Sequence, residues 1–411
     1  MKDQQSGPGP SPWATQWEQR PWNGGTTRTE PMSRRMQLRS RGPYDACIPV
    51  PLAQMKIDLP AEVTAESEDA LTEIIRFDAE LATALPVPER GHQQLAPLSA
   101  VLLRTESASS SQIEKITAGA KALALASIGA SSGPNARLVV ANVAAMEAAL
   151  ELSQNLSEDS IKAAHAALLD GQEALDPGRY RSQQVWIGGS APTPHTATFV
   201  PPHPDRVPAA MSDLLRFIRR TDVPVLTHAA LAHAQFETIH PFADGNGRTG
   251  RALIHAMLHS AGRTNSLTIP VSAGLLSNTS AYFAALMDFR NGDPAPVVQQ
   301  LARAGFKGVH NGRLLAQDIL DMHGTWQDRV RSRRGASVWA LLPLLIAQPA
   351  ITTAFVVSQL EISTPAAQTA IDHLVEIGVL QPVSSAARNR VWVAGEVIAA
   401  LDAFGKRARR A

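Results

Sequence analysis

Apolar residues recur at intervals of three and four along most of the chain, the spacing that places them on one face of an α-helix. Ile74, Phe77 and Leu81 follow it within a helix predicted over residues 64–86. The same spacing, together with alanine-rich stretches that favour helix, predicts further helices over residues 109–128, 137–155, 159–170, 208–220, 227–239, 248–262 and 279–290. The fold class predicted from this pattern is all-α.

Residues 181–202 interrupt the helical pattern. Gln184-Val-Trp-Ile187 and Thr196-Ala-Thr-Phe-Val200 have the character of two short strands around a loop rich in glycine and proline. This arrangement is typical of a β-hairpin. Pro201 and Pro202 follow the second strand and end it.

Composition divides the chain into four parts. Residues 1–42 are rich in Pro, Gly, Ser, Gln, Thr and Arg and lack periodicity, which predicts a disordered tail. Three tryptophans in it, Trp13, Trp17 and Trp22, leave a docking segment as the alternative. Composition changes again after the basic run at 331–334. We therefore predict a tail at 1–42, an N-terminal helical region at 43–155, a helical core at 156–325 and a separate domain at 336–404.

The last part shows three helices followed by two strands. The helices span 338–346, 353–360 and 365–377, and the strands span 378–383 and 388–393. This order resembles a winged helix-turn-helix domain, in which the third helix and the wing face DNA. Here those positions are held by Gln368, Thr369, Arg388 and Arg390. The third helix carries little positive charge, so DNA binding and a role as a dimer or docking module both stay open.

Bulk composition excludes several classes of protein. The 411 residues carry a net charge of +1 and a single cysteine, Cys47, which excludes a disulfide framework and a cluster of zinc-binding thiolates. No apolar run approaches the roughly 20 residues of a membrane-spanning helix, and the first residues lack the pattern of a signal peptide. We expect a cytoplasmic protein without a membrane partner.

The strongest chemical signal is the segment His240-Pro-Phe-Ala-Asp-Gly-Asn-Gly-Arg-Thr-Gly-Arg251. Apolar stripes before it (Phe236, Ile239) and after it (Ile254, Leu258) place it in a turn between two helices. The start of a helix offers unpaired N–H groups and a positive dipole end. The glycines at 245 and 247 let the backbone curl around an anion. The segment therefore predicts a phosphate site.

Its other side chains suit phosphoryl chemistry. Asp244 is a hard oxygen ligand of the kind that Mg²⁺ takes, and Arg248 and Arg251 offer forked donors for phosphate oxygens. Asn246 can donate to a phosphate oxygen, and His240 can accept a hydroxyl proton near neutral pH.

The glycines also match the GxGxxG of dinucleotide-binding folds. That fingerprint follows a strand in a βαβ unit, whereas here the predicted element before it is a helix. A dinucleotide-binding fold is therefore not predicted.

The whole segment resembles the signature of the Fic domain family, His-x-Phe-x-(Asp/Glu)-Gly-Asn-Gly-Arg-x-x-Arg, and matches each specified position. The resemblance implies a helical protein that transfers AMP from ATP to a protein hydroxyl, with His240 as the base and Asp244 as the Mg²⁺ ligand. It implies that Arg251 binds the γ-phosphate and that Phe242 fixes the loop. The remaining nucleotide-binding residues that it implies are Gly245, Asn246, Gly247, Arg248 and Gly250.

Further stretches are similar to family features over roughly residues 44–310. The hairpin at 184–200 is similar to the flap on which a target segment is laid as an added strand. Ser110-Ser-Gln-Ile-Glu114-Lys115 resembles the family's inhibitory helix, (Ser/Thr)-x-x-x-Glu-(Gly/Asn), expected here near 109–125. There the glutamate pairs with the second signature arginine, here Arg251. Lys115 departs from the pattern, and the alternative is that Glu114 is one more solvated helix residue.

Two positions downstream are also informative. Ser277-Asn-Thr-Ser-Ala-Tyr282 resembles the helix start that lines the adenine pocket, which makes Tyr282 a base contact or, alternatively, a core residue. Gly292-Asp-Pro294 stands where the family commonly has Gly-Asp-Trp, so the packing there is expected to differ.

The function predicted is a Mg²⁺-dependent protein adenylyltransferase that Glu114 inhibits, with a target protein bound along the 184–200 flap. A homodimer is implied by the resemblance only. Two alternatives stay open. One is removal of AMP from a modified protein, with Glu114 positioning water. The other is a nucleotide-sensing, DNA-binding regulator, which the intact His240 and Asp244 disfavour.

Overall fold

Helices make up most of the computed structural model, which describes residues 11–22, 34, 40–82, 84, 97–130, 133–189, 193–265, 267–383 and 390–410. The helices are α2 Ala61–Leu81, α3 Pro97–Ile113, α4 Ala120–Ser127, α5 Pro134–Glu151, α6 Glu158–Leu168, α7 Val207–Ile218, α8 Val225–Ile239, α9 Asn246–Ser260, α10 Val271–Leu276, α11 Thr279–Asn291, α12 Ala295–Arg329, α13 Ser337–Ala347, α14 Thr353–Leu360, α15 Thr364–Glu376 and α16 Gly395–Ala408. The strands are β1 Gln16–Arg20, β2 Tyr44–Ile48, β3 Ala350–Ile351, β4 Gln381–Pro382 and β5 Trp392–Val393. The all-α prediction is confirmed. None of the described helices is long and apolar enough to cross a membrane.

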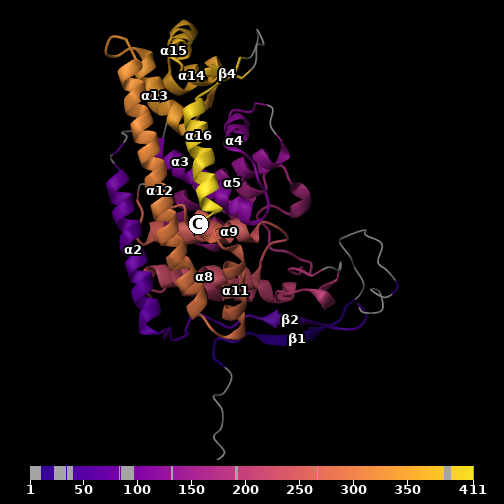
Figure 1. Ribbon diagram of the computed structural model, residues 1–411. Coiled ribbons are helices and arrows are strands. Elements are labelled where there is room, and N and C mark those ends of the chain that lie inside the picture. Colours follow the sequence, from indigo (N-terminus) through magenta and orange to yellow (C-terminus); the bar gives the residue numbers. More distant parts are fainter. Residues whose placement is uncertain are drawn as a thin grey trace, which may run out of the picture.

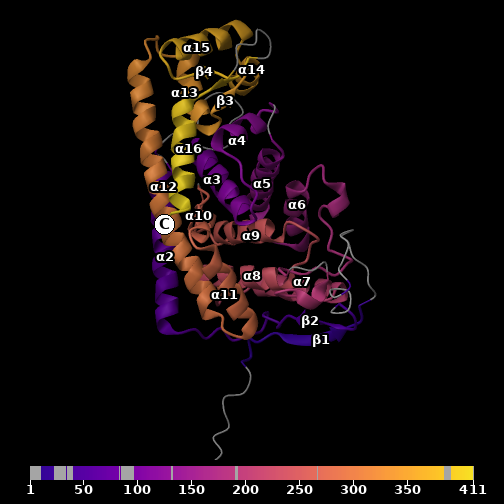
Figure 2. The same ribbon diagram turned by 45° about the vertical axis from the view of Figure 1, so that its right-hand side comes forward.

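Two helices at the centre carry the candidate site. α8 is buried at every position after Val225, including the polar residues His233 and Glu237. α9 follows it, and the turn between them holds the 240–246 loop. α2, α3, α5, α6, α7, α11 and α12 surround this pair (Figures 1 and 2).

Three helices were absent from the sequence-based prediction: α10, α12 and α16. α12 contains Gly305, Gly308 and Gly312, and glycine lowers helix propensity by about 1 kcal/mol. Tertiary packing explains these glycines, because a Cβ at Gly308 would lie 2.6 Å from Pro270 O and one at Gly312 would lie 2.7 Å from Phe77 Cζ. The glycines thus allow α10 and α2 to approach α12 closely.

Residues 11–22 are ordered, which corrects the predicted tail over that part of it. β1 pairs antiparallel with β2, and Gln16 lies opposite Ile48. The tryptophans supply the apolar contacts: the ring of Trp13 packs on Phe289 and that of Trp17 on Phe199, with centroids 6.2 and 6.0 Å apart. Average composition does not reveal that a few large side chains in a polar segment pack against residues far away in the sequence. Residues 1–10, 23–33 and 35–39 lie outside the described residues.

Among the described residues of the predicted flap hairpin, the pairing is a single β-bridge between Ile187 and Phe199. Residues 194–196 form a 3-10 turn instead of strand. Gly188 and Gly189 adopt φ values of 69° and 86°, so the backbone turns away immediately after the bridge. On the other side, the N–H of Cys47 donates to Val200 O at 3.0 Å, which joins β2 to the flap.

The single helix predicted over 109–128 is two helices. α3 ends at Ile113, Glu114 and Lys115 form a turn, and α4 begins at Ala120. Lys115 has φ 63°, a left-handed conformation that a right-handed helix cannot contain. Glu114 therefore lies at the C-terminal end of α3 and not within a helix.

The composition change near residue 331 is not a break in packing. One connected cluster of buried side chains includes Leu301 and Ile319 of α12, Leu341 of α13 and Phe404 of α16. α16 runs back from the C-terminal helices toward α9 and packs against α12 and α3 (Figures 1 and 2). The region 337–408 is therefore held against the core by α12 and α3.

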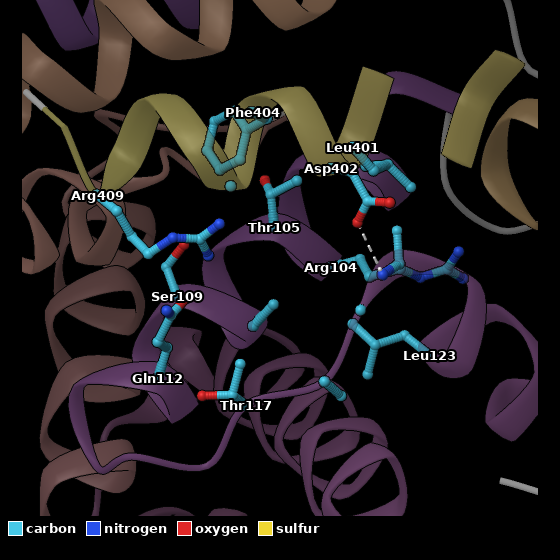
Figure 3. A pocket seen from close by; sticks show the side chains of 15 residues that line it. Arg104, Thr105, Ser109, Gln112, Thr117, Leu123, Leu401, Asp402, Phe404 and Arg409 are labelled. Atoms are coloured by element: carbon cyan, nitrogen blue, oxygen red, sulfur yellow. Dashed lines mark hydrogen bonds between the residues drawn. The ribbon is translucent and has the colours of Figure 1, made fainter. Parts of the chain in front are cut away.

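A cavity of about 240 Å³ separates α16 from α3 and α4. Figure 3 shows Thr105, Ser109 and Gln112 of α3 on one wall and Phe404 of α16 on the opposite wall. Asp402 Oδ1 bridges the two sides by accepting the N–H of Ala120 at 3.2 Å. α3 thus has α9 on one face and α16 on another.

Candidate active site

His240 is positioned by the end of α8. Its backbone is left-handed, with φ 50°, and its N–H donates to Phe236 O at 2.8 Å. This conformation costs roughly 1–2 kcal/mol for a residue other than glycine, and such strain concentrates at functional sites. Ring atom Nδ1 is buried and faces Glu237, whose Oε2 lies 3.7 Å away. Nε2 is therefore the ring nitrogen left to meet a substrate.

Asn246 holds the loop in shape. Its Oδ1 accepts the N–H of Phe242 at 2.9 Å, and its Nδ2 donates to the carbonyl of the same residue, also at 2.9 Å. The side chain is buried. The tight turn leaves the backbone groups of Phe242 without helix partners, and the amide satisfies them. Donation by Asn246 to a phosphate stays a prediction.

Gly245 and Gly247 shape the start of α9. Gly245 precedes the helix with φ 77°, which favours glycine. A Cβ at Gly247 would collide with Glu114 Oε1. A carboxylate therefore already lies against the first turn of α9, where the helix dipole and the free N–H groups favour negative charge.

Gly250 faces inward from α9 and not toward the phosphate site. A Cβ at this position would lie 3.0 Å from His233 Nδ1, 3.0 Å from a ring carbon of Phe236 and 3.1 Å from Glu237 Oε1. The lack of a side chain at this position leaves room for α8, and nucleotide binding by Gly250 stays a prediction.

Arg248 is buried but has unused donors. The residue is 3% exposed, and its Nε and Nη1 have no hydrogen-bond partner in the described part of the chain. Asp244 Oδ2 lies 3.8 Å from its Nη2. Burial lowers the pKa of this guanidinium. Because unpaired buried donors cost about 1–3 kcal/mol, the side chain is arranged to receive an acceptor such as a phosphate oxygen.

Arg251 is fully engaged by α3. Its Nε donates to Ser110 Oγ at 2.9 Å, and its Nη2 donates to Ser110 O at 2.8 Å and to Glu114 Oε1 at 3.0 Å. Burial opposes the charge of Arg251, but the carboxylate of Glu114 raises its pKa above the usual value. The pairing of Glu114 with Arg251, which the resemblance implies, is present.

α3 is fixed on α9 by further buried contacts. Glu106 lies two helical turns before Glu114, and its Oε1 lies 2.8 Å from His255 Nε2. The same carboxylate accepts the Oγ–H of Ser272 at 2.5 Å and the N–H of that residue at 2.8 Å. Glu106 and Ser110 of α3 and Glu114 directly after its end therefore form one stripe that faces α9.

Tyr282 is a core residue, the alternative that the sequence left open. It is 2% exposed, its hydroxyl lies 2.8 Å from His233 Nε2, and the two rings stack with centroids 5.9 Å apart. Its assignment as an adenine contact stays a prediction. A hydroxyl with a buried partner favours the interior position.

Asp244 is the residue that fits a magnesium ion. Its side chain is 57% exposed, and one oxygen, Oδ1, accepts the N–H of Gly245 at 2.7 Å. The described residues contain no group of three or more potential metal ligands. One protein carboxylate is enough to hold Mg²⁺ when the phosphates of a bound substrate and water molecules supply the remaining ligands. The donor set therefore fits Mg²⁺ that arrives with a nucleotide.

Two side chains that support the loop escaped the sequence analysis. His165 of α6 stacks on Phe242 with ring centroids 3.7 Å apart, accepts the N–H of Gly178 on Nδ1 and lies 3.0 Å from Asp244 O through Nε2. Burial lowers its pKa to about 4, so the neutral ring donates from Nε2. Arg181 donates to His240 O at 2.8 Å and to Pro202 O at 2.5 Å. Neither residue has a local sequence signal, because both act across long chain separations.

Lys115 occupies the position where the family pattern has Gly or Asn. Its φ of 63° is the conformation that these two residues adopt most readily. The departure therefore does not change the turn after α3, but it adds backbone strain beside Glu114.

Lys115→Gly is expected to raise the midpoint of thermal unfolding, because relief of the left-handed strain, roughly 1–2 kcal/mol, exceeds the entropic cost of glycine, about 0.5–1 kcal/mol. Lys121→Gly, on the exposed side of α4, is the matched control and should lower the midpoint. If both variants lower it to the same extent, Lys115 is not strained.

Comparison with known proteins places this site in a family. The sequence profile of the Fic/DOC family matches residues 155–258. "Protein adenylyltransferase Fic" of Nematostella vectensis is 31% identical over 157 residues, which are 38% of this chain and 33% of that protein. "Protein adenylyltransferase fic-1" of Caenorhabditis elegans is 28% identical over 151 residues, 36% of this chain and 27% of that protein. The chain thus spans a third or less of the length of these curated relatives.

The fold has a counterpart among solved structures. A Fic family protein from Desulfovibrio desulfuricans G20 superposes with a TM-score of 0.51 at 22% identity, over 83% of this chain and 98% of that chain. The structure is that of a helical protein with a tight, glycine-containing loop between two buried helices. It is a Fic domain-containing protein, with the Fic domain at residues 155–258.

Proposed function

We propose that this protein transfers AMP from ATP to a hydroxyl side chain of a target protein and that Glu114 holds this activity low. The observation that carries the proposal is Arg248, a buried guanidinium with two unpaired N–H groups at the start of α9. An anion that arrives between this side chain and the first turn of α9 would satisfy both. The names of the curated relatives support AMP as the transferred group.

In this reaction the target hydroxyl oxygen attacks the α-phosphorus of ATP. The bond from that phosphorus to the oxygen bridging the β-phosphate breaks, and pyrophosphate leaves. The hydroxyl proton passes to Nε2 of His240, since Nδ1 is the ring nitrogen that faces Glu237. Arg248 and the N–H groups of α9 hold phosphate oxygens, which is where most catalysis of phosphoryl chemistry originates. Mg²⁺ at Asp244 would neutralise part of the phosphate charge.

Glu114 is proposed as the inhibitor because its carboxylate lies where a nucleotide phosphate would bind. Glu114 Oε1 accepts from Arg251 Nη2 at 3.0 Å and lies against Gly247. A carboxylate and a phosphate compete for the same donors. The stripe of contacts from Glu106 to Ser110 keeps α3 in place, so release requires movement of the Glu114 side chain or of the turn that carries it.

A target segment is proposed to bind along residues 184–187. β2 already joins the flap through the Cys47 N–H to Val200 O bond. A target segment that binds as an added strand would therefore pair with residues 184–187, on the side of the Ile187–Phe199 bridge that faces away from β2.

For residues 337–408 we propose a winged helix-turn-helix that helps to hold α3. The sheet order β3-β5-β4 and the turn at Glu361 between α14 and α15 support this arrangement. Contacts of α16 and α13 with α3 support the docking role. DNA binding stays a prediction: Gln368 and Thr369 lie on α15, Gln368 Nε2 donates to Asp372 Oδ1 at 2.8 Å, and Arg388 lies outside the described residues. A homodimer and a cytoplasmic location also stay predictions.

The function is tested with the Glu114→Gly variant of the 411-residue chain, a cell lysate as the source of targets, and ATP labelled on either the α- or the γ-phosphate. Transfer of the α-label but not the γ-label to protein is the expected result, and Glu114→Gly/His240→Ala protein should transfer neither. Absence of labelling, or equal labelling by the two variants, would contradict the proposal. Release of labelled AMP from modified protein by the unsubstituted chain would identify removal of AMP instead.

A further inference from the structure

We propose that Glu237 is the positioning residue for His240: its buried carboxylate holds the ring with the proton on Nδ1 and stabilises the imidazolium that forms when Nε2 accepts a proton. The effect of Glu237 on the reaction rate rests on the proposed AMP transfer. The ring geometry that it predicts is independent of that activity.

The carboxylate of Glu237 lies inside the core and points at the base. The residue is 6% exposed, and its Oε1 has no hydrogen-bond partner among the residues that the structure describes. Its Oε2 lies 3.7 Å from His240 Nδ1. Burial opposes ionisation, but His240, His233 and Arg251 nearby hold the pKa of this carboxyl at about 2. A charged group this deep in a core needs a polar partner.

The atom of His240 that faces this carboxylate also lacks a hydrogen-bond partner. Nδ1 of His240 is buried and has no hydrogen-bond partner within the described ranges of the chain. A carboxylate only accepts, so the contact selects the tautomer with the proton on Nδ1. The 3.7 Å separation is longer than a hydrogen bond, as is common for catalytic pairs before the substrate binds.

Two other titratable groups near Glu237 are Arg251 and His233, whose Nδ1 has no hydrogen-bond partner among the described residues. Tyr282 occupies Nε2 of His233 at 2.8 Å, and burial lowers the pKa of His233 to about 4, so that ring is neutral. Arg251 is bonded to Ser110 and Glu114. His240 is therefore the partner that can become cationic next to the carboxylate during the reaction.

The local sequence places the pair. Glu237 and His240 are three residues apart across the end of α8, and the left-handed backbone of His240 (φ 50°) turns its ring back toward the helix. The absence of a side chain at Gly250 leaves the space, because a Cβ there would lie 3.1 Å from Glu237 Oε1.

The first measurement is made on the unsubstituted protein by NMR of ¹⁵N-labelled histidine rings, with His240→Ala identifying the His240 signals. We expect the ring to carry its proton on Nδ1 at a pH where it is neutral. A proton on Nε2 would overturn the proposal, whether or not the protein transfers AMP.

The second measurement is single-turnover transfer in the Glu114→Gly background. Glu237→Gln is expected to lower the rate at saturating ATP at least about 10²-fold, the lower range for general base catalysis, while the concentration of ATP giving half-maximal rate changes little. Glu237→Leu should lower the rate as well, and in the NMR measurement its His240 ring should no longer carry the proton on Nδ1. Asp213→Asn, which neutralises a buried carboxylate bonded to Leu52 N, is the matched control and should lower only the unfolding temperature. An unchanged rate for Glu237→Gln would refute the proposal; a Glu114→Gly protein without any transfer would instead refute the proposed function.

Discussion

Glu114→Gly is expected to raise the rate of AMP transfer roughly 10- to 100-fold, the factor that corresponds to losing hydrogen bonds to a charged group worth about 1.5–3 kcal/mol. The carboxylate occupies Nη2 of Arg251 at 3.0 Å and lies against Gly247. Its removal leaves the first turn of α9 and one donor of Arg251 open to phosphate. The measurement is the initial rate of α-label transfer, compared with the unsubstituted chain.

Two variants distinguish loss of the Glu114 carboxylate from greater mobility of the turn as the cause of a higher rate. Glu114→Gln keeps the shape and removes the charge, so it should activate in part. Lys115→Gly introduces a glycine one residue later and keeps the carboxylate, so it should stay inhibited. Activation by Lys115→Gly equal to that of Glu114→Gly would show that mobility of the turn, and not competition for Arg251, limits the rate.

Arg248→Met is expected to weaken ATP binding at least about 10²-fold, because charge-assisted hydrogen bonds are worth roughly 1.5–3 kcal/mol each, and at the same time to maintain or raise the unfolding temperature. The two effects have opposite signs because Nε and Nη1 of Arg248 are buried without partners. Methionine removes that cost and leaves an apolar side chain of similar length. ATP affinity is measured by calorimetry in the Glu114→Gly background, and stability by thermal unfolding without nucleotide.

Arg251→Met is the matched control for stability. Its donors are bonded to Ser110 Oγ, Ser110 O and Glu114 Oε1, so its loss leaves buried acceptors unpaired and should lower the unfolding temperature. Equal destabilisation by Arg248→Met and Arg251→Met would mean that Arg248 is satisfied in the folded protein and does not await a ligand.

The sequence by itself determined the parts of the protein that depend on short chain separations. The glycines, Asp244 and His240 follow one another within a single turn, so local turn chemistry was enough to predict an anion site at the start of a helix. Helical spacing predicted α8 and α9 to within two residues at either end. The pattern from Ser110 to Glu114 also predicted which acidic residue faces Arg251, through family resemblance.

Only the tertiary structure decided which side chains face the ligand and which face the protein. Asn246 and Gly250 belong to the same motif as Arg248, yet the first bonds to Phe242 and the second lies against His233. Their direction depends on how α8 and α9 pack. Periodicity within one helix does not contain that information.

Long-range contacts also determined where the chain is ordered. Trp13 and Trp17 order residues 11–22 by packing on Phe289 and Phe199, which are far away in sequence. α12 forms despite its glycines because Phe77 and Pro270 approach its backbone. No sequence motif points to Glu237, because its proposed role depends on where its buried carboxylate lies relative to the ring of His240. Local sequence specifies turn and helix chemistry, whereas burial and side-chain direction are set by all the elements that pack together.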